Sequence, residues 1–378
     1  MTAQAALVDR DGTRTAELVL SKWFVVSPYG VGNDPFADGV LSGRSAISGV
    51  DRSQFDVPYE LVGLVPDFSA AKYLGNKGTR LMDRLTALAV TAAGGLVDQC
   101  REDLVADPER AALVLGTGWA SVQSIMDTTR DSLTGDKPYH VDPAKFPNTV
   151  MNKAAGQSAI WHTIKGPNTT ISGDWLTALL TLSYAARLVR GGHCDRALCG
   201  VAEEYSAQRA WLEWHAGRAG GDGMSALGEG SAFFLLESAA DAERSGRTPL
   251  VRLLATRFTA FGADGDAGAA LRDCVRAALR HAGVGPEQVR VVAPAGAGAA
   301  PVENDVLTGE FGASAPEWIR SRHLIGDASA ASAGFQIAAV LAAAGRKPLA
   351  RDEAAVVTTI GRDGMTGCLV LGGCGGSS

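Results

Sequence analysis

The chain has 378 residues and a formal net charge of −6 at pH 7, with 46% hydrophobic and 20% charged residues. This balance is typical of a folded core and is too apolar for intrinsic disorder. The negative charge argues against nucleic acid as a partner and against direct electrostatic docking of an acidic protein.

Length alone allows two or three domains or one large α/β unit. The six cysteines show neither CxxC nor Cys/His ligand spacing. We therefore expect reduced core thiols and no metal site. The glycine-rich stretches at 116–120 and 296–299 complete no nucleotide-binding motif, so no cofactor is expected. Without a signal-peptide pattern or a run of about 18 apolar residues, the chain is expected to be cytoplasmic.

In the first part of the chain, strand-like and helix-like segments alternate. The sequence predicts strands at residues 16–26, 111–116, 197–202 and 232–236, and helices at residues 82–97 and 176–190. The segment 82–97 is rich in Ala and Leu, which is typical of a buried helix packed closely on its neighbours.

The pattern repeats after residues 241–254. Helices are predicted at residues 267–282, 304–311 and 333–344, and strands at residues 289–293, 356–360 and 368–371. Strands alternating with helices indicate sheets covered on both faces. We therefore expect an α/β protein built as a twofold repeat, with halves at residues 1–245 and 246–378 forming one unit.

Four motifs in one collinear order resemble the ketosynthase branch of the thiolase superfamily. They are KGTRLMDRLTALA (77–89), FPNTVMNKAAGQSAIWHTIKGPNTTIS (146–172), GEGSAFFLLES (228–238) and GCLVLGG (367–373). The resemblance covers nearly the whole chain, roughly residues 23–371. It implies the thiolase fold, with five α-β-α-β-α layers and two pseudo-duplicated halves.

The same resemblance implies that the catalytic positions are degenerate. In TTISGDWLT (169–177), Trp175 occupies the position of the nucleophilic cysteine, and an indole cannot attack a thioester. Ala295 and Ala328 fall at the two histidine positions, where side chains normally stabilise developing oxyanion charge. His323 replaces the family's lysine, and Arg362 falls where a gating phenylalanine would lie. We therefore expect no catalytic residue and no condensation chemistry from this chain alone.

One group resembling ketosynthases lacks the cysteine: the chain length factors of bacterial type II polyketide systems. Membership in this group implies an obligate heterodimer with an active ketosynthase, whose acyl tunnel the subunit continues. An acyl carrier protein would then be reached through the complex. The usual residue at the cysteine position is Gln, so Trp175 departs from the common pattern and argues against a priming decarboxylation. This divergence favours a branch that builds polyenes.

The resemblance also predicts where product length is set. The tunnel-floor positions map to Trp119, Val122 and Met126, whose spacing predicts one helical face. That face could equally be plain core or dimer interface. The loop at 139–146 matches the family's excursion toward the partner, so Lys145 and Phe146 are predicted to lie at the interface.

Two other function classes stay open from the sequence. The chain could be an acyltransferase or esterase that uses Ser172 or Asp174, although a serine needs an adjacent base to become nucleophilic. It could also be a homodimeric acyl-binding scaffold without a condensing partner.

Overall fold

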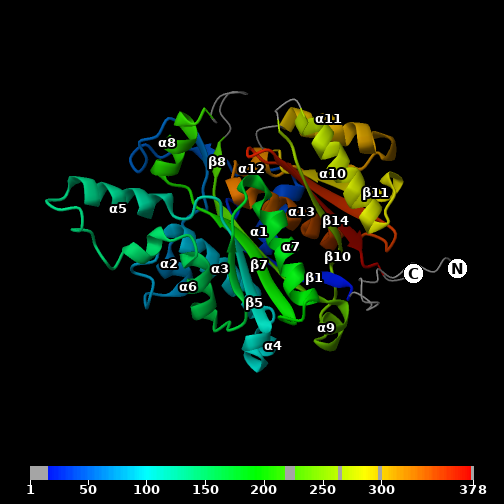
Figure 1. Cartoon of the computed structure of the whole chain (residues 1–378), viewed down its shortest axis with the longest axis horizontal. Helices are drawn as coiled ribbons and strands as arrows, with labels where there is room; N and C mark the ends of the chain where they lie inside the picture. Colours follow the sequence, from blue (N-terminus) through cyan, green and yellow to red (C-terminus); the bar gives the residue numbers. More distant parts are fainter. Residues whose placement is uncertain (1–15, 218–225, 263–265, 297–299, 376–378) are drawn as a thin grey trace.

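The computed structural model describes residues 16–217, 226–262, 266–296 and 300–375 (Figure 1). Its main sheet contains two groups of five strands arranged in the same way. In the first half, the spatial order from the edge inward is β6 (Asn168–Ile171), β5 (Ala111–Gly116), β7 (Arg196–Glu203), β9 (Gly230–Ser238) and β1 (Leu18–Ser27). In the second half it is β12 (Glu317–Trp318), β11 (Val289–Pro294), β13 (Ala354–Ile360), β14 (Met365–Gly373) and β10 (Val251–Ala260).

The two groups also share their strand directions. β5 pairs in parallel with β6 and β7, and β9 pairs antiparallel with β7 and β1. β11, β12, β13, β14 and β10 repeat this pattern element for element. The groups meet where β1 pairs with β10, through Val19↔Arg252 and Leu20↔Val251. This repeated topology is the pseudo-duplication that the family resemblance implies.

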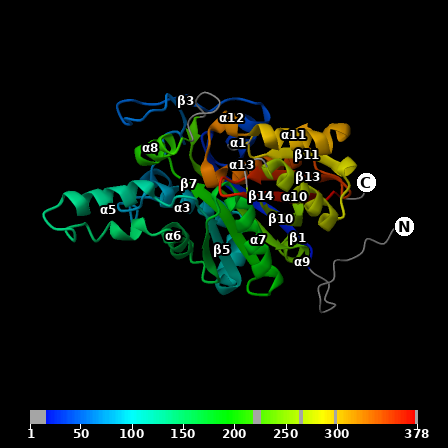
Figure 2. The ribbon, with the colours of Figure 1, turned by 45° about the horizontal axis from the view of Figure 1, so that its top comes forward.

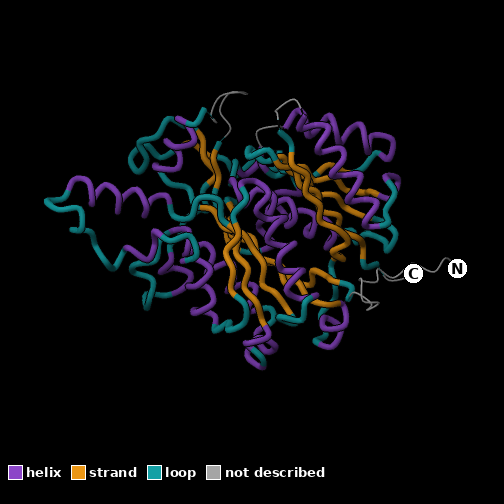
Figure 3. The backbone as a smooth tube through the Cα atoms, in the orientation of Figure 1, coloured by secondary structure: helices purple, strands orange, loops and turns teal. Residues whose placement is uncertain are grey.

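Helices cover both faces of each group (Figures 1 and 3). On the outer face of the first lie α3 (Arg84–Asp98) and α6 (Lys153–His162), and on the second α10 (Ala267–Ala282) and α11 (Ala300–Phe311). Between the groups lie α7 (Thr177–Arg190) and α13 (Ser332–Arg346). Nearly every residue of α13 is buried, as expected for a helix that is apolar all round and packed on both sides. The predicted α/β thiolase architecture is confirmed.

The remaining elements decorate this core. They are β2 (Gly30–Val31), α1 (Asn33–Leu41), β3 (Ser48–Gly49), β4 (Leu61–Gly63), α2 (Ala70–Leu74), α4 (Arg101–Ala106), α5 (Val122–Thr134), α8 (Ala207–His215), β8 (Leu227–Gly228), α9 (Ala239–Arg244) and α12 (Arg322–Ile325). The turned view shows α5 and the chain after it projecting from the body as an arm (Figure 2). No helix in the described ranges has the length and hydropathy needed to cross a membrane.

The predicted elements are all observed, and the main difference is that the structure contains elements that the sequence did not predict. β5 and α10 have the predicted bounds, and the other predicted elements are displaced by a few residues at their ends. The long strand β10 was not predicted, because Arg252 and Arg257 interrupt its apolar pattern. Arg252 is nevertheless buried, and its Nε donates to the carbonyl of Gly373 at 2.8 Å. The predicted boundary between the halves, at residues 245–246, falls between α9 and β10 and stays a prediction.

Candidate functional site

The turn between β6 and α7, where the sequence predicts the position of the family's nucleophile, has a left-handed backbone and carries a large buried side chain. Asp174 adopts a left-handed conformation with φ of 51°, which is uncommon for a residue other than glycine. Thr177 Oγ1 accepts a hydrogen bond from the backbone N–H of Gly173 at 3.1 Å and donates to the carbonyl of Asp174 at 2.6 Å. Trp175 follows, with only 5% of its surface exposed. The turn therefore points a buried indole into the protein.

Arg362 closes over this indole from the other half of the chain. Its guanidinium carbon lies 4.2 Å from the centre of the Trp175 ring, a cation–π contact. The backbone N–H of Arg362 donates to Asp174 Oδ2 at 2.7 Å, and its Nε and Nη2 donate to Oδ1 at 3.1 and 2.6 Å. The neighbouring Gly361 allows this approach, since a Cβ there would lie 2.5 Å from Leu176 Cδ1.

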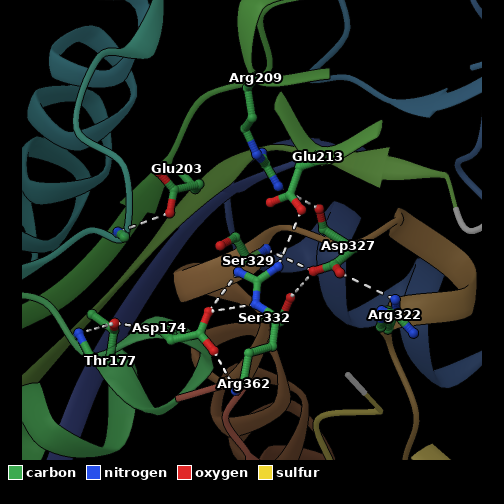
Figure 4. A network of polar contacts seen from close by, with 12 residues as sticks. Asp174, Thr177, Glu203, Arg209, Glu213, Arg322, Asp327, Ser329, Ser332 and Arg362 are labelled. Atoms are coloured by element: carbon green, nitrogen blue, oxygen red, sulfur yellow. Dashed lines mark hydrogen bonds and ion pairs between the residues drawn. The ribbon is translucent and has the colours of Figure 1, made fainter. Parts of the chain in front are cut away.

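A second carboxylate completes the cluster. Glu213 of α8 accepts a hydrogen bond from Arg362 Nη1 at 3.2 Å (Figure 4). Both carboxylates are largely buried, with side chains 9% exposed for Asp174 and 5% for Glu213. We call these four residues the plug cluster: Asp174, Trp175, Glu213 and Arg362. In the plug cluster a buried indole fills the turn, and the charge of the arginine is paired with two buried carboxylates. Buried charges are tolerated when they are paired in this way.

The two positions predicted for missing histidines carry only methyl groups. Ala295 and Ala328 are each 1% exposed. Ala295 directly follows β11, and its backbone N–H donates a hydrogen bond to the carbonyl of Thr358 at 3.0 Å. Neither side chain can donate a hydrogen bond to an oxyanion, so the described residues at these positions offer no polar side-chain group for condensation chemistry.

The carboxylate beside Ala328 is held by arginines. Asp327 Oδ2 lies 3.2 Å from Arg322 Nη2, while its Oδ1 accepts from the N–H of Ser329 at 2.8 Å and from Ser332 Oγ at 3.2 Å (Figure 4). Burial alone would raise the pKa of Asp327, but Arg322 and Arg209 hold that pKa below its ordinary range. The guanidinium of Arg209 in turn donates to the backbone carbonyl of Asp327 at 2.9 Å.

His323 does not take over the role of the family's lysine. It lies on α12 with an exposed side chain, where burial and the neighbouring Arg320 lower its pKa. The adjacent Arg322 is the residue that turns inward, since its guanidinium reaches both the carbonyl of Gly296 and Asp327.

Three other buried carboxyl groups, those of Glu203, Glu204 and Glu303, have raised pKa values. Burial raises the pKa of Glu203 and Glu303 to about 7 and that of Glu204 to about 8. Each carboxyl group accepts a hydrogen bond of 3.0 Å from a backbone N–H. The donors are Gly118 for Glu203, Leu85 for Glu204 and Gly296 for Glu303. These carboxyls fasten loops to the core.

The proposed replacement nucleophiles are poorly equipped for acyl transfer. Asp174 is engaged by Arg362 through both carboxylate oxygens. Ser172 is exposed, and no described side chain that could act as a base hydrogen-bonds to it. Among the described residues, no base is hydrogen-bonded to either side chain in the way that activates a nucleophile.

The predicted tunnel-floor residues do not share one helical face. α5 begins at Val122, so Trp119 lies in the preceding loop, and Ala120 between them has φ of 55°. The prediction was wrong here because the left-handed residue breaks the helical register. Val122 is buried at 4% exposure, whereas Met126, one turn later, is 43% exposed. Trp119 is half-buried, and its backbone N–H hydrogen-bonds to Glu203.

The predicted interface residues lie on the projecting arm. Phe146 is 55% exposed, and Lys145 beside it is also exposed. Other large apolar side chains on α5, α6 and their connection are exposed as well: Leu133, Tyr139, Val150, Met151 and Ile160. β6, the edge strand next to this arm, hydrogen-bonds to β5 on one side only among the described strands. An unpaired edge next to apolar side chains is typical of a protein interface.

Sequence reasoning missed the partners of the degenerate positions. It noted Arg362 and Asp174 separately but not their ion pair, and it did not single out Glu213, Arg322 or Asp327. An arginine at an interior family position should have prompted a search for a buried carboxylate, since such a cation needs one. The six cysteines are all unbridged, and the described residues contain no cluster of metal-ligating side chains.

Comparisons with known proteins identify the family to which the chain is similar. The model of the family "Beta-ketoacyl synthase, N-terminal domain" matches residues 24–242. The actinorhodin polyketide beta-ketoacyl synthase 2 of Streptomyces coelicolor is 31% identical over 301 residues, covering 72% of each chain. The 3-oxoacyl-[acyl-carrier-protein] synthase 2 of Vibrio cholerae is 26% identical over 306 residues, covering 73% of this chain and 72% of its own.

Among solved structures, the ishigamide ketosynthase/chain length factor superposes with a TM-score of 0.87 and 40% identity, covering 95% of this chain and 100% of that one. A type II polyketide ketosynthase in complex with its acyl carrier protein superposes with a TM-score of 0.79 at 18% identity, covering 95% and 99% of the two chains, and shows the shared fold. The expected resemblance to ketosynthases and chain length factors is thereby confirmed. The chain belongs to the beta-ketoacyl synthase family.

Proposed function

We propose that this chain is a non-condensing subunit that pairs with an active ketosynthase and shapes the acyl tunnel that sets polyketide or polyene chain length. The observation that carries the proposal is the plug cluster. At the turn where the family places its nucleophile, an indole 5% exposed lies under the guanidinium of Arg362, which is itself paired with Asp174 and Glu213.

The plug cluster favours a structural role for this turn over an acyl transfer that uses a nucleophile at a neighbouring position. An acyl thioester would have to displace Trp175, and Arg362 would then lose its cation–π contact with the indole. Such a contact is worth about 2 kcal/mol when it is desolvated. The methyl groups at Ala295 and Ala328 add no stabilisation for an enolate or oxyanion. A site of this kind supports structure and leaves bond formation to a partner.

The names of the similar proteins support the class of partner. The ishigamide protein is described as a ketosynthase/chain length factor, and the actinorhodin relative belongs to a polyketide system. In our proposal, the β6 edge and the arm carrying Lys145 and Phe146 contact the ketosynthase subunit. The acyl carrier protein is met by the assembled complex, which acts in the cytoplasm, where reduced cysteines persist.

Within this assembly, Trp119 and Val122 are the residues that we place at the tunnel floor. Val122 is buried in the subunit itself, and Trp119 lies beside it on a loop anchored to Glu203. Met126 is exposed in the single chain, so in our proposal it reaches the tunnel or the partner only on assembly.

The test is co-expression with a ketosynthase encoded next to this chain that retains its cysteine and both histidines. We expect a 1:1 complex by size exclusion and light scattering, and elongated products only from the complex. The chain alone is expected to self-associate, because an unpaired subunit exposes an interface that in permanent pairs is often 2,000 Å² or larger. A stable, active homodimer, or a covalent acyl adduct on the chain alone, would overturn the proposal.

A further inference from the structure

A groove far along α7 from the plug cluster gathers positive charge. Its volume is about 380 Å³, and it is lined by residues from the second half of α7, from β10 and from the end of α10. Four of its lining side chains are basic: Arg187 and Arg190 from α7, Arg257 from β10 and His281 from α10. We call this feature the basic groove.

The charge of the basic groove is not balanced locally. No aspartate or glutamate is among the residues that line it. Within the described residues, the guanidinium of Arg190 makes neither an ion pair nor a hydrogen bond, and burial lowers the pKa of Arg190. Arg257 donates to the neighbouring carbonyl of Thr256 at 2.8 Å. Burial, Arg257 and Arg190 together lower the pKa of His281. On a chain of net charge −6, this is a local excess of cations.

Helix termini explain only part of the cluster. Arg187 and Arg190 lie in the last turn of α7, and His281 lies in the last turn of α10, where cations are favoured by the helix dipole. Arg257 comes from a strand and gains nothing from a helix end. Its presence brings a third element to the same concavity, so the convergence needs a further cause.

The walls of the basic groove are preorganised. Leu253 and Ala255 of β10 are buried, as is Ala186 of α7, and Thr256 Oγ1 donates to Ser183 Oγ at 3.2 Å across the groove. Guanidinium groups on such a rigid frame match the geometry of phosphate oxygens through paired N–H donors. The volume lies at the small end of the range of about 300–1,000 Å³ that is typical of small-molecule sites.

We propose that the basic groove is a binding site for a phosphate-bearing small molecule, held by Arg190 and Arg257 with Arg187 and His281 at its sides. This site is separate from the proposed tunnel and does not depend on the proposed function. An acidic surface of a partner subunit is the competing occupant, and the experiment distinguishes the two.

Pyrophosphate and inorganic phosphate are the probes, titrated by calorimetry at constant ionic strength into the chain as purified and into its complex with a ketosynthase. The double variant Arg190→Gln/Arg257→Gln removes two cations from the basic groove. Arg101→Gln/Arg346→Gln is the matched control, because these exposed arginines pair with exposed Asp98 and Asp38 elsewhere. Circular dichroism verifies that both variants are folded.

We expect pyrophosphate to bind the wild type, with the dissociation constant rising about tenfold or more in the groove variant and changing less than about twofold in the control. The same binding should persist in the complex. Absence of binding to folded wild type, or equal losses in both variants, would overturn the proposal. Binding that disappears on assembly would also overturn it, since the basic groove would then be part of the subunit interface.

Discussion

The two turns that precede the central helices are related by the internal repeat, yet side chains of very different size occupy them. In the first half, the turn before α7 carries the bulky Trp175 beside the left-handed Asp174. In the second half, the turn before α13 carries the small Ala328 beside the left-handed Ser329, with φ of 48°. One site is filled and the other is truncated, while both keep the strained backbone.

An arginine also holds each of the two turns, but the turns differ in how many other contacts hold their carboxylates (Figure 4). Arg362 lies between two carboxylates, Asp174 and Glu213, and pairs with both. Asp327 has Arg322 at 3.2 Å and additionally two hydrogen bonds from serines. The comparison teaches that an ion pair with an arginine holds each left-handed turn in place, and that the turn at Asp174 relies more heavily on one arginine.

The largest effect is expected from removing that residue. Arg362→Met removes the cation that pairs with Asp174 and Glu213 and should lower the free energy of unfolding by about 3–5 kcal/mol. Arg322→Met should cost less, about 1.5–3 kcal/mol, because the serine hydrogen bonds to Asp327 remain. Urea denaturation measures both. Arg346→Met, at an exposed pair with Asp38, serves as the control and should change stability by less than about 1 kcal/mol. Equal losses for Arg362 and Arg322 would contradict the difference between the turns.

The sequence predicted the framework of this comparison but not its contacts. The collinear motifs and the alternating elements were sufficient for the fold, since period and order are local properties. The positions Trp175, Ala295, Ala328 and Arg362 were singled out because they lie inside recognisable motifs, and their assignment as degenerate catalytic positions stays a prediction. The ion pair between Asp174 and Arg362 joins residues 188 positions apart. No local pattern encodes such a contact.

The helical face at Trp119 shows a second kind of limit. Spacing of three and seven residues indicates one face only if the helix is continuous, and Ala120 with positive φ interrupts it. An alanine carries no sequence signal for a left-handed conformation, unlike glycine or asparagine. The sequence did not predict β10 for a related reason. Its buried Arg252 donates hydrogen bonds to backbone carbonyls that only the folded protein brings close.

The filled turn offers the second test. Trp175→Cys supplies a thiol where the family has one, but it removes most of a buried indole, so stability should fall by about 2–5 kcal/mol. Condensing and decarboxylating activity should remain at background, because Ala295 and Ala328 still provide no hydrogen-bond donors. Mass spectrometry after incubation with acyl-carrier thioesters checks for an adduct, and a malonyl decarboxylation assay checks for turnover. Measurable turnover by this single variant would show that the truncated turn is not limiting.

The pH dependence of stability should be carried by the buried carboxyls. Burial raises the pKa of Glu303 from an ordinary 4.5 to about 7. Between these values the folded protein keeps a proton that the unfolded chain has released, so the unfolding free energy falls as pH rises through this window. The loss for this one group is up to about 3 kcal/mol. Asp327, with its lowered pKa, has the opposite sign and loses stability only as pH falls below its ordinary range.

Glu303→Gln is the variant that isolates this effect. It should reduce the slope of unfolding free energy against pH between 5 and 8, as measured by urea denaturation at several pH values. Glu353→Gln is the control, because hydrogen bonding to Ala350 and Arg290 lowers the pKa of Glu353, and its removal should leave that slope unchanged. An unaltered slope in Glu303→Gln would mean that the carboxyl stays ionised in the folded protein.

The smallest effect on the fold, and the most specific one on function, is expected near the start of α5. In the complex, Trp119→Ala enlarges the proposed tunnel floor by far more than the two methylenes of one extension cycle, so products should lengthen by one or more cycles. Val122→Phe should shorten the products, because the larger side chain leaves less room for the growing acyl chain. Overpacking a buried position typically costs about 1–3 kcal/mol, and elongation should stop before that cost is reached.

Met126→Ala is the comparison variant, at a position that is exposed in the single chain. It separates an effect on the tunnel floor from an effect on the subunit interface. Size exclusion must show intact assembly for all three variants, and mass spectrometry of the released products gives their lengths. If the assembled Trp119→Ala and Val122→Phe complexes make the wild-type product distribution, these residues do not floor the tunnel, and the region next to the filled turn acts in packing alone.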